Sequence, residues 1–382
     1  MFWDYQTEIL SIIFTILVTG GATFLFYPAI LVYYHEDIDH TTTIIQNQTK
    51  SGDKNNKSNE NKEEDVLFSL VIPAYNEEDR LTVMLEECYE YFARPTCPAL
   101  DNLQLAYQKA NSNATKDTII LVEWIVVNDG SSDKTCHVFE QYVAKIQKES
   151  QQSNNAAHKN RHFLFKLVSL NKNEGKGAAV HVGMTEATGY FRLMVDADGA
   201  TTFGKGLEAV TQELLQHHDN NTTTGGGAST TQNDSSTIIP SVIIFGSRAG
   251  EGGAQRTALR AFLMHSFLWL RSCVVGTPVS LRDTQCGFKL FDKTSAMQLF
   301  SNLHLRRWAF DIELVYVALS MGMLIQEVTV PWHEVDGSKL NTGFLALVWV
   351  SIGMLRDMMC VRACYVLGIW NIRPHGPAPP QP

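Results

Sequence analysis

Residues 190–200 read YFRLMVDADGA and join a short apolar strand to a pair of acids. The predicted strand covers residues 190–195, and Asp196 and Asp198 follow it directly. Two acids separated by one residue at a strand end can point into the same crevice, and in open α/β sheets ligands bind at this carboxyl edge. Carboxylate oxygens suit Mg²⁺ or Mn²⁺, which in turn bridge to phosphate oxygens. A pair of solvated turn acids is the alternative interpretation.

The same order of strand, polar turn and helix recurs on both sides of this segment. Strands and helices that alternate at this length predict right-handed crossovers and a mainly parallel sheet with both faces covered. Three polar stretches interrupt the order, and we expect them to be surface insertions. The predicted strands are 67–73, 123–128, 163–170, 190–195 and 237–245, the helices are 77–92 and 177–187, and the insertions lie near 97–117, 147–160 and 217–236.

Three further strands end in residues that can bind a ligand. Pro73, Tyr75 and Glu77 lie at the end of the first strand. Asp129 follows the second, where its carboxylate can accept a hydrogen bond from a base or a ribose, or can cap the next helix. Lys176 follows the third and can approach a phosphate. Because the carboxyl ends of parallel strands meet at one edge, we expect these side chains to share a crevice.

The carboxyl-terminal third adds three candidates. Arg248 follows the fifth strand, and its guanidinium can hold a phosphate through two parallel hydrogen bonds, or can form a surface ion pair. Asp283 opens the sequence DTQCGFKLF. Asp311 and Glu313 are two residues apart on a predicted helix and do not share a face, so at most one of them reaches the site.

Several other classes of function are disfavoured. Gly175 and Gly177 suggest a dinucleotide fingerprint, but the position three beyond Gly177 is Val180, and no Walker sequence is present. The net charge of -9 and a pI near 5.7 argue against nucleic-acid binding through a basic face. The seven cysteines have no CxxC spacing, which disfavours a disulfide scaffold or a zinc ribbon and fits a reducing compartment.

The amino terminus predicts a membrane anchor. Residues 9–34 carry no charged side chain, and a helix of this length, about 39 Å, can cross a hydrocarbon core about 30 Å thick. A cleaved signal peptide is disfavoured, because the start carries Asp4 and Glu8 and no basic residue. We therefore expect the chain to be attached to a lipid bilayer.

A second apolar stretch, residues 344–370, lies near the carboxyl terminus. Arg356, Asp357 and Arg362 interrupt it. Charges inside a spanning helix cost about 2.5–3.5 kcal/mol each on insertion scales. We therefore expect this stretch to lie at the membrane interface, or to be buried against the domain, without crossing the bilayer.

Taken together, the motifs identify a resemblance to glycosyltransferase family 2, with its GT-A fold. The resemblance is carried by VIPAYNEEDRL, VNDGSSDKT, NEGKGAAV, VDADGA, GSR, DTQCGFKLF and RWAFDIEL, and it extends from Val66 to about Trp370 without the insertions. Within the family, the sequence is most similar to the enzymes of the endoplasmic reticulum that glucosylate dolichyl phosphate. The implied fold is an α/β, Rossmann-like catalytic domain with a mainly parallel sheet.

The resemblance implies a reaction and a set of roles. The donor is UDP-glucose, the acceptor is dolichyl phosphate, and inversion at the sugar carbon gives dolichyl β-D-glucosyl phosphate for protein N-glycosylation. The metal, Mg²⁺ or Mn²⁺, is expected on Asp198 and Asp196. The implied catalytic residues are Asp283, Asp311 and Arg248, and the implied donor-binding residues are Pro73, Tyr75, Glu77, Asp129, Lys176, Asp196 and Asp198.

The sequence departs from the patterns of related enzymes at two places, and two other functions remain as alternatives. Mannose-transferring relatives carry a metal-binding Gln where this chain has Ala200, and the QxxRW motif of polysaccharide-synthesising relatives is absent although Arg307 and Trp308 are present. A mannosyltransferase that uses GDP-mannose, and an inactive membrane-anchored scaffold that binds a nucleotide sugar, are the alternatives.

The expected location is the membrane of the endoplasmic reticulum, with one crossing and the catalytic domain in the cytosol, where UDP-glucose is made. The predicted organisation is a lumenal tail at 1–8, the anchor at 9–34, a flexible polar tether at 35–65, the GT-A domain at 66–342, a membrane-interface region at 343–372 and a Pro-rich tail at 373–382.

Overall fold

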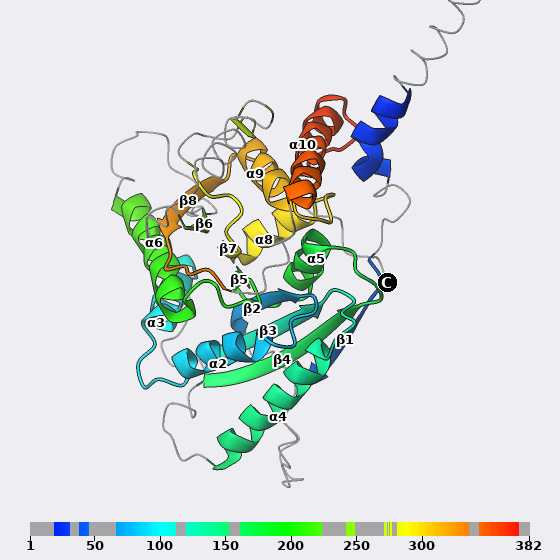
Figure 1. The fold of residues 1–382 in the computed structure, drawn as a ribbon. Helices are drawn as coiled ribbons and strands as arrows, with labels where there is room; N and C mark the ends of the chain where they lie inside the picture. Colours follow the sequence, from blue (N-terminus) through cyan, green and yellow to red (C-terminus); the bar gives the residue numbers. More distant parts are fainter. Residues whose placement is uncertain are drawn as a thin grey trace, which may run out of the picture.

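A mixed eight-stranded sheet forms the centre of the described part of the chain in this computed structural model (Figure 1). The structure describes residues 19–30, 38–45, 66–111, 120–152, 161–223, 242–248, 271–272, 274, 276, 281–335 and 344–373. The strands are β1 (His40–Ile45), β2 (Val66–Ala74), β3 (Ile120–Asn128), β4 (Arg161–Leu170), β5 (Phe191–Val195), β6 (Val242–Ser247), β7 (Phe288–Asp292) and β8 (Leu324–Thr329). Their order across the sheet is β1-β4-β3-β2-β5-β7-β6-β8.

The pairing of the strands brings their functional ends to one edge. Strands β4, β3, β2 and β5 are parallel neighbours, and Asn128 at the end of β3 pairs with both Ala74 and Ser169. Strand β7 runs antiparallel to β5 and β6, so its first residue, Phe288, pairs with Val195 at the end of β5. The predicted α/β class with a mainly parallel sheet is confirmed.

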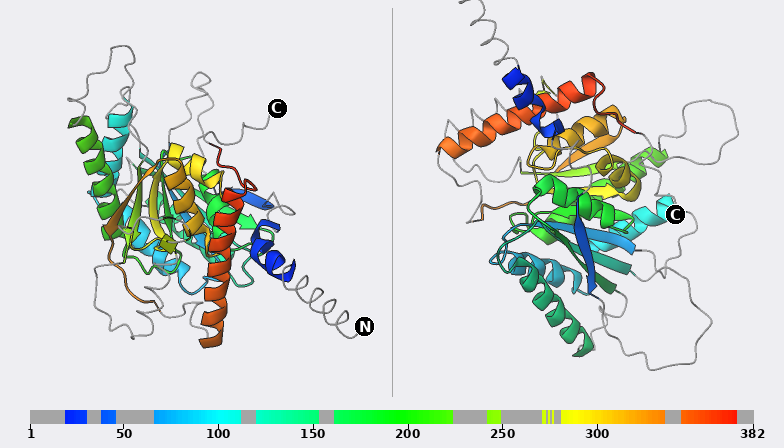
Figure 2. Two further views of the ribbon diagram at one scale, coloured as in Figure 1. Left: turned by 90° about the horizontal axis from the view of Figure 1, so that it is seen from above. Right: turned by 90° about the vertical axis from the view of Figure 1, so that its right-hand side faces the viewer.

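Helices cover both faces of the sheet (Figures 1 and 2). On one face α2, α3, α4 and α6 bury a core with Trp124 and several phenylalanines, and on the other α5, α8, α9 and α10 bury a core of smaller aliphatic side chains. The helices are α2 (Leu81–Phe92), α3 (Pro98–Ala110), α4 (Thr135–Gln152), α5 (Lys176–Glu186), α6 (Phe203–Thr223), α8 (Lys293–Phe300), α9 (Phe310–Ser320) and α10 (Phe344–Val366).

Strand β1 lies inside the segment that was predicted to be a flexible tether, so that prediction is wrong for residues 40–45. The sequence HTTTII is rich in β-branched residues, which favour strands. It pairs antiparallel with β4 and covers that edge of the sheet. The hydroxyl of Thr42 and the ring of His40 also contact the carboxylate of Glu186.

The first predicted insertion is in part a packed helix, so the surface assignment is wrong for α3. Pro98 stands in its first turn, where a missing N–H costs nothing. Leu100, Leu103 and Ala106 are buried. The helix packs against α6, as in the bond from Asn102 to Thr211. The polar composition of this stretch reflects only its outer face. Of the other two insertions, residues 147–152 continue α4 and residues 217–223 continue α6, and the rest lies outside the described residues.

Residues 19–30, the described part of the predicted anchor, are helical and lie beside α10 (Figure 2). The guanidinium of Arg356 stands over the rings of Phe24 and Tyr27 at 5.5 and 5.6 Å. Within the described ranges, no helix combines the length and the apolar character needed to cross a membrane. Residues 9–18 and 31–34 of the predicted anchor lie outside the described residues.

Candidate active site

Lys176 and Asp196 form an ion pair at the carboxyl edge of the sheet. The ammonium of Lys176, at the start of α5, lies 2.6 Å from Oδ1 of Asp196, which follows β5. Gly287 lies against Asp196, since a Cβ at position 287 would overlap its carboxyl group. The Asp196 side chain is 33% exposed and Lys176 is 17% exposed, so the pair faces solvent from one side only.

The charge on Lys176 is firmly held. Burial lowers the pKa of Lys176, but the charges of Asp196 and Asp311 outweigh burial and raise the pKa above its ordinary value. The ammonium also lies 5.8 Å from the centre of the ring of Trp308, an exposed side chain. The site therefore keeps a permanent cation beside a flat aromatic surface.

A second ion pair lies beneath the first and is buried. Lys289 in β7 is inaccessible to solvent, and its ammonium donates to Asp311 at 2.7 Å and to the carbonyl of Cys286 at 2.6 Å. Burial raises the pKa of Asp311, while Lys289 and Lys176 lower it. The sequence did not assign a role to Lys289, although a lysine inside the apolar run FKLF signals a paired buried charge. Glu313 points to a different set of partners, as its position on the helix predicted.

Arg248 and Asp283 form another ion pair, joined by two side-chain bonds. Nε and one terminal nitrogen of Arg248 lie 2.6 and 2.8 Å from the two carboxylate oxygens of Asp283, and the backbone N–H of Arg248 donates as well. Burial raises the pKa of Asp283, but Arg248 outweighs burial and holds the pKa below its ordinary value. Asp283 is therefore a weak proton acceptor while this pair persists. The ring of Trp332 lies 5.8 Å from the Arg248 guanidinium.

Asp129 holds the turn that leads into Lys176. Its carboxylate accepts hydrogen bonds from the backbone N–H groups of Glu174 and Gly175 at 2.7 and 2.9 Å. The helix that follows is capped by Asp133, whose carboxylate accepts from the N–H of Thr135 at 3.0 Å. Burial raises the pKa of Asp129 to about 6 despite these donors.

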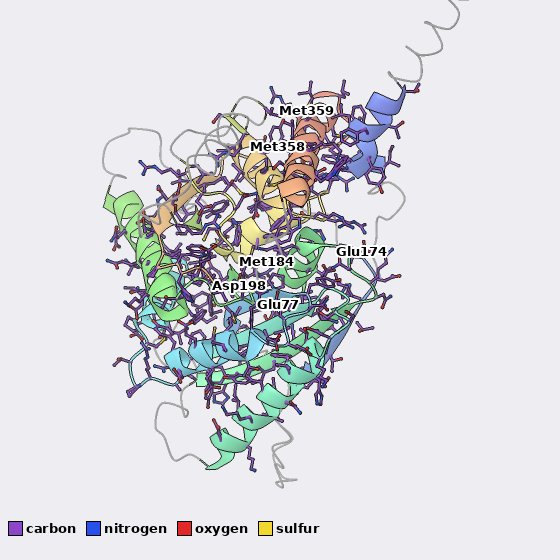
Figure 3. All side chains as sticks on the ribbon, in the orientation of Figure 1. Glu77, Glu174, Met184, Asp198, Met358 and Met359 are labelled. Carbon is purple, nitrogen blue, oxygen red and sulfur yellow. The ribbon has the colours of Figure 1, made fainter. Side chains whose placement is uncertain are left out.

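The predicted residues after β2 take different roles. Glu77 is buried and paired with Arg80 at 2.6 Å, and its backbone N–H donates to the hydroxyl of Thr135. Pro73 pairs in register with Val127, and Tyr75 is half-buried in the turn. Figure 3 labels Glu77 and Asp198, which come from the turns after β2 and β5. In this structure the carboxylate of Glu77 is paired with Arg80 at the start of α2, and its backbone N–H is bonded to Thr135 at the start of α4.

Of the two acids after β5, Asp198 is the one whose carboxylate can still bind a metal ion. Its Oδ1 accepts from the N–H of Ala200 at 3.0 Å, and the side chain is half-exposed. Among the described residues, no three His, Cys, Asp or Glu side chains stand close enough to form a metal site of their own. One or two carboxylates completed by water and substrate phosphates are nevertheless the usual Mg²⁺ arrangement, so the oxygen donors present fit such an ion.

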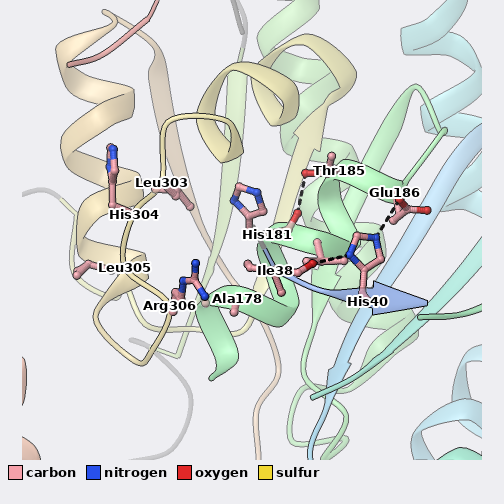
Figure 4. Close-up of a pocket in the computed structure, with 12 residues that line it drawn as sticks. Ile38, His40, Ala178, His181, Thr185, Glu186, Leu303, His304, Leu305 and Arg306 are labelled. Carbon is pink, nitrogen blue, oxygen red and sulfur yellow. Dashed lines mark hydrogen bonds and ion pairs between the residues drawn. The ribbon is translucent and has the colours of Figure 1, made fainter. Parts of the chain in front are cut away.

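A cavity of about 350 Å³ lies against a different part of α5 (Figure 4). None of the predicted site residues lines it. His181 and Arg306 stand on its wall, and burial and the charge of Arg306 lower the pKa of His181 to about 4. His40 borders it from β1, and its ring lies 3.4 Å from Glu186. The cavity is thus separate from the ion pairs at the strand ends.

The chain is similar in sequence to one protein family and to several named proteins. Residues 69–235 match the model of Glycosyl transferase family 2. The chain is 34% identical over 321 residues to a dolichyl-phosphate beta-glucosyltransferase of Dictyostelium discoideum, covering 82% of this chain and 80% of that protein. It is 36% identical to the protein of the same name in Drosophila melanogaster (80% and 77% covered) and 34% identical to that of Homo sapiens (80% and 78%). Among solved structures, glucosyl-3-phosphoglycerate synthase from Mycobacterium tuberculosis aligns with a TM-score of 0.41 at 15% identity, covering 78% of this chain and 80% of that one.

An α/β sheet whose carboxyl edge gathers paired cations and acids, together with the family match, defines a glycosyltransferase of family 2. Within that class the chain belongs to the dolichyl-phosphate β-glucosyltransferase family, since it aligns over most of the length of several members at 31–36% identity.

Proposed function

We propose that this chain transfers glucose from UDP-glucose to dolichyl phosphate, with inversion, to give dolichyl β-D-glucosyl phosphate. The observation that carries the proposal is the pair of cations, Lys176 and Arg248, at one sheet edge. Lys176 lies 2.6 Å from Asp196, which follows β5, and Arg248 follows β6, which runs in the same direction as β5 because both are antiparallel to β7. Two fixed cations suit a reaction in which negative charge develops on a departing diphosphate.

The acceptor supplies its own nucleophile. A phosphomonoester has a second pKa near ~6, so its oxygen is anionic at neutral pH and can attack the sugar carbon without a strong protein base. A bond forms from that oxygen to C1 of glucose, and the bond from C1 to the diphosphate oxygen breaks, so that UDP leaves with the electron pair. The protein must align the two substrates and stabilise the leaving group.

The residues of the site divide this work. Lys176 stabilises charge on the diphosphate. Arg248 offers its remaining donors to a phosphate, while Asp283 fixes the plane of its guanidinium. The depressed pKa of Asp283 favours this orienting role over that of a general base. Asp311 and Lys289 form the buried ion pair beneath the site and neutralise each other's charge.

A divalent cation, Mg²⁺ or Mn²⁺, completes the proposed donor site. Asp198 would be its main protein ligand, because Asp196 is already paired with Lys176. Such an ion would supply Lewis-acid stabilisation of the diphosphate charge.

We further propose that the protein works at the membrane of the endoplasmic reticulum, with its catalytic domain in the cytosol. Residues 19–30 and α10 lie side by side, and both expose large apolar side chains. Trp349 is 70% exposed and Leu367 is 65% exposed. An apolar surface with Arg356 at its centre suits the interface of a bilayer, where a lipid acceptor is available.

The test is a donor and acceptor screen on the full chain in washed membranes or detergent, with and without chelator. We expect transfer from UDP-glucose to dolichyl phosphate, little transfer from GDP-mannose, and loss of activity on chelation. Asp198→Asn should lower the rate by about a hundredfold or more while the protein stays folded. Equal use of GDP-mannose would point to a mannosyltransferase, and donor binding without transfer to an inactive scaffold. A rate above about a tenth of wild type in Asp198→Asn would remove the metal assignment.

A further inference from the structure

A buried carboxylate outside the ion pairs of the site organises the loop between α8 and α9. Glu313 is inaccessible to solvent and accepts four hydrogen bonds. Two come from the backbone N–H groups of His304 and Leu305 at 2.9 and 2.7 Å. The others involve Nδ1 of His304 at 2.8 Å and the hydroxyl of Tyr365 at 3.0 Å. A buried carboxylate with this many partners fixes the loop in one conformation.

Two of the groups that hold this loop come from the end of α10 and from the turn that follows it. The Tyr365 hydroxyl lies 3.2 Å from the carbonyl of Asn302 as well as bonding to Glu313. The indole of Trp370 stacks on the ring of His304 at 4.3 Å with an interplanar angle of 3°. We call Glu313, His304, Tyr365 and Trp370 the Glu313 cluster. It joins α9, the loop and the end of α10 into one unit.

The other side of the same loop shapes the turn that carries Lys176. The carbonyl of Arg306 accepts from the N–H of Ala178 at 2.9 Å, and its guanidinium pairs with Glu174 at 3.1 Å. The loop backbone also lies against Gly175 and Gly177, where a Cβ would approach the carbonyls of Arg306 and Leu305 within 2.6 Å. The loop therefore lies between the Glu313 cluster on one side and the turn at residues 174–178 on the other.

We propose that the Glu313 cluster is a positioning device for the donor site, and that α10 is thereby a structural part of that site as well as a surface for lipid. The cluster does not touch the reacting atoms. It acts through the loop 302–307 on the placement of Lys176. The proposal rests on the proposed function, because it assumes that Lys176 binds the diphosphate of UDP-glucose.

The test compares two tyrosines that differ by one hydrogen-bonding role. Tyr365→Phe removes only the hydroxyl that reaches Glu313 and the carbonyl of Asn302. Tyr316, in α9, stacks on the ring of Tyr365 at 4.8 Å, so Tyr316→Phe is the matched control. Both variants keep the aromatic packing. The readouts are the Kd of UDP-glucose by calorimetry, KM and kcat for transfer, and the melting temperature.

We expect Tyr365→Phe to raise the Kd and the KM for UDP-glucose several-fold and to lower kcat as well, because a displaced Lys176 both binds the diphosphate less well and stabilises its developing charge less well. Tyr316→Phe should stay within about twofold of wild type. A purely structural role would lower the melting temperature and the active fraction while KM stayed constant, and that pattern would overturn the proposal. If Tyr365→Phe is too unstable to assay, Trp370→Leu, which removes the ring stacked on His304, must also raise the KM. A wild-type chain that does not bind UDP-glucose would instead overturn the proposed function.

Discussion

At the scale of single residues, the site is ordered by alternating charge. Lys289, Asp311, Lys176 and Asp196 follow one another from the core to the surface as cation, anion, cation and anion. Removing one member of a buried pair leaves the other uncompensated, which costs several kcal/mol. The arrangement therefore lets the protein keep Lys176 charged close to the interior without a large loss of stability.

Position 287 has no room for a side chain larger than that of glycine. Gly287→Ala would force a methyl group onto the carboxyl group of Asp196, so we expect Asp196 or the 283–287 loop to move and the transfer rate to fall at least tenfold. Gly353→Ala in α10, where nothing lies within 4 Å of the added carbon, is the control and should keep wild-type activity. Steady-state rates with melting temperatures would check this, and normal activity in Gly287→Ala would show that the Asp196 position is unimportant.

The pKa of Asp129 near 6 predicts a pH dependence of donor binding. Below pH 6 the carboxyl group is protonated and loses much of its attraction for the N–H groups of Glu174 and Gly175, so the turn before Lys176 should loosen. The Kd of UDP-glucose should then rise as the pH falls through about 6, by up to tenfold per unit. Without acceptor, the phosphomonoester does not contribute to the profile. Asp129→Asn should bind weakly with a flat profile between pH 5 and 8; an unchanged slope in that variant would assign the titration to another group.

Residue types and their spacing predict most of the candidate site residues. They do not predict which side chain pairs with which. The strand-end positions of Lys176, Asp196 and Arg248 follow from the alternation of strands and turns, and they meet at one edge as expected. The pairing of Arg248 with Asp283 across 35 positions depends on the reversed direction of β7, which no local pattern predicts. The engagement of Glu77 by Arg80 likewise depends on how α2 starts.

At the scale of elements, α10 shows why composition alone was ambiguous. Two of its three charges are paired with each other, since Arg356 lies 2.7 Å from Asp357, and Arg356 also covers two aromatic rings of residues 19–30. The apolar side chains are divided between the core, as Met358 and Val361, and the exterior. A helix that is apolar on both sides shows no helical period in its sequence. The sequence therefore cannot tell which of its apolar side chains face the core and which face the exterior.

This division predicts how α10, together with Leu367 in the turn that follows it, contacts lipid. A chain that begins at Ile38 should still float with vesicles, and the double variant Trp349→Asp, Leu367→Asp should reduce the bound fraction at least fivefold, because two exposed apolar contacts are replaced by charge. Val83→Asp, which alters an equally exposed apolar residue on α2, is the matched control. Vesicle flotation at low and high salt measures the effect. A shortened wild-type chain that stays in solution at both salt concentrations would contradict the membrane role of α10.

At the scale of the whole molecule, the proposed orientation can be checked without an activity assay. Six sequons stand in the chain, and a domain in the lumen of the endoplasmic reticulum would expose several of them to glycosylation. We expect no change in electrophoretic mobility on endoglycosidase treatment of protein from a eukaryotic host. A shift to lower mass would reverse the orientation and remove access to cytosolic donor. The sequons begin at Asn47, Asn56, Asn113, Asn220, Asn221 and Asn233.

Strand β1 has a consequence for the order in which the protein is made. It leaves the ribosome well before its partner β4, and His40 contacts Glu186, 146 positions later. At about 5–20 residues per second, that interval lasts on the order of ten seconds. Strand β1 must therefore wait unpaired while β2, β3 and β4 are synthesised, and it can pair before β5, β6, β7 and β8 leave the ribosome. Nascent chains halted before residue 161 should leave β1 open to protease, and chains that extend past α5 should protect it.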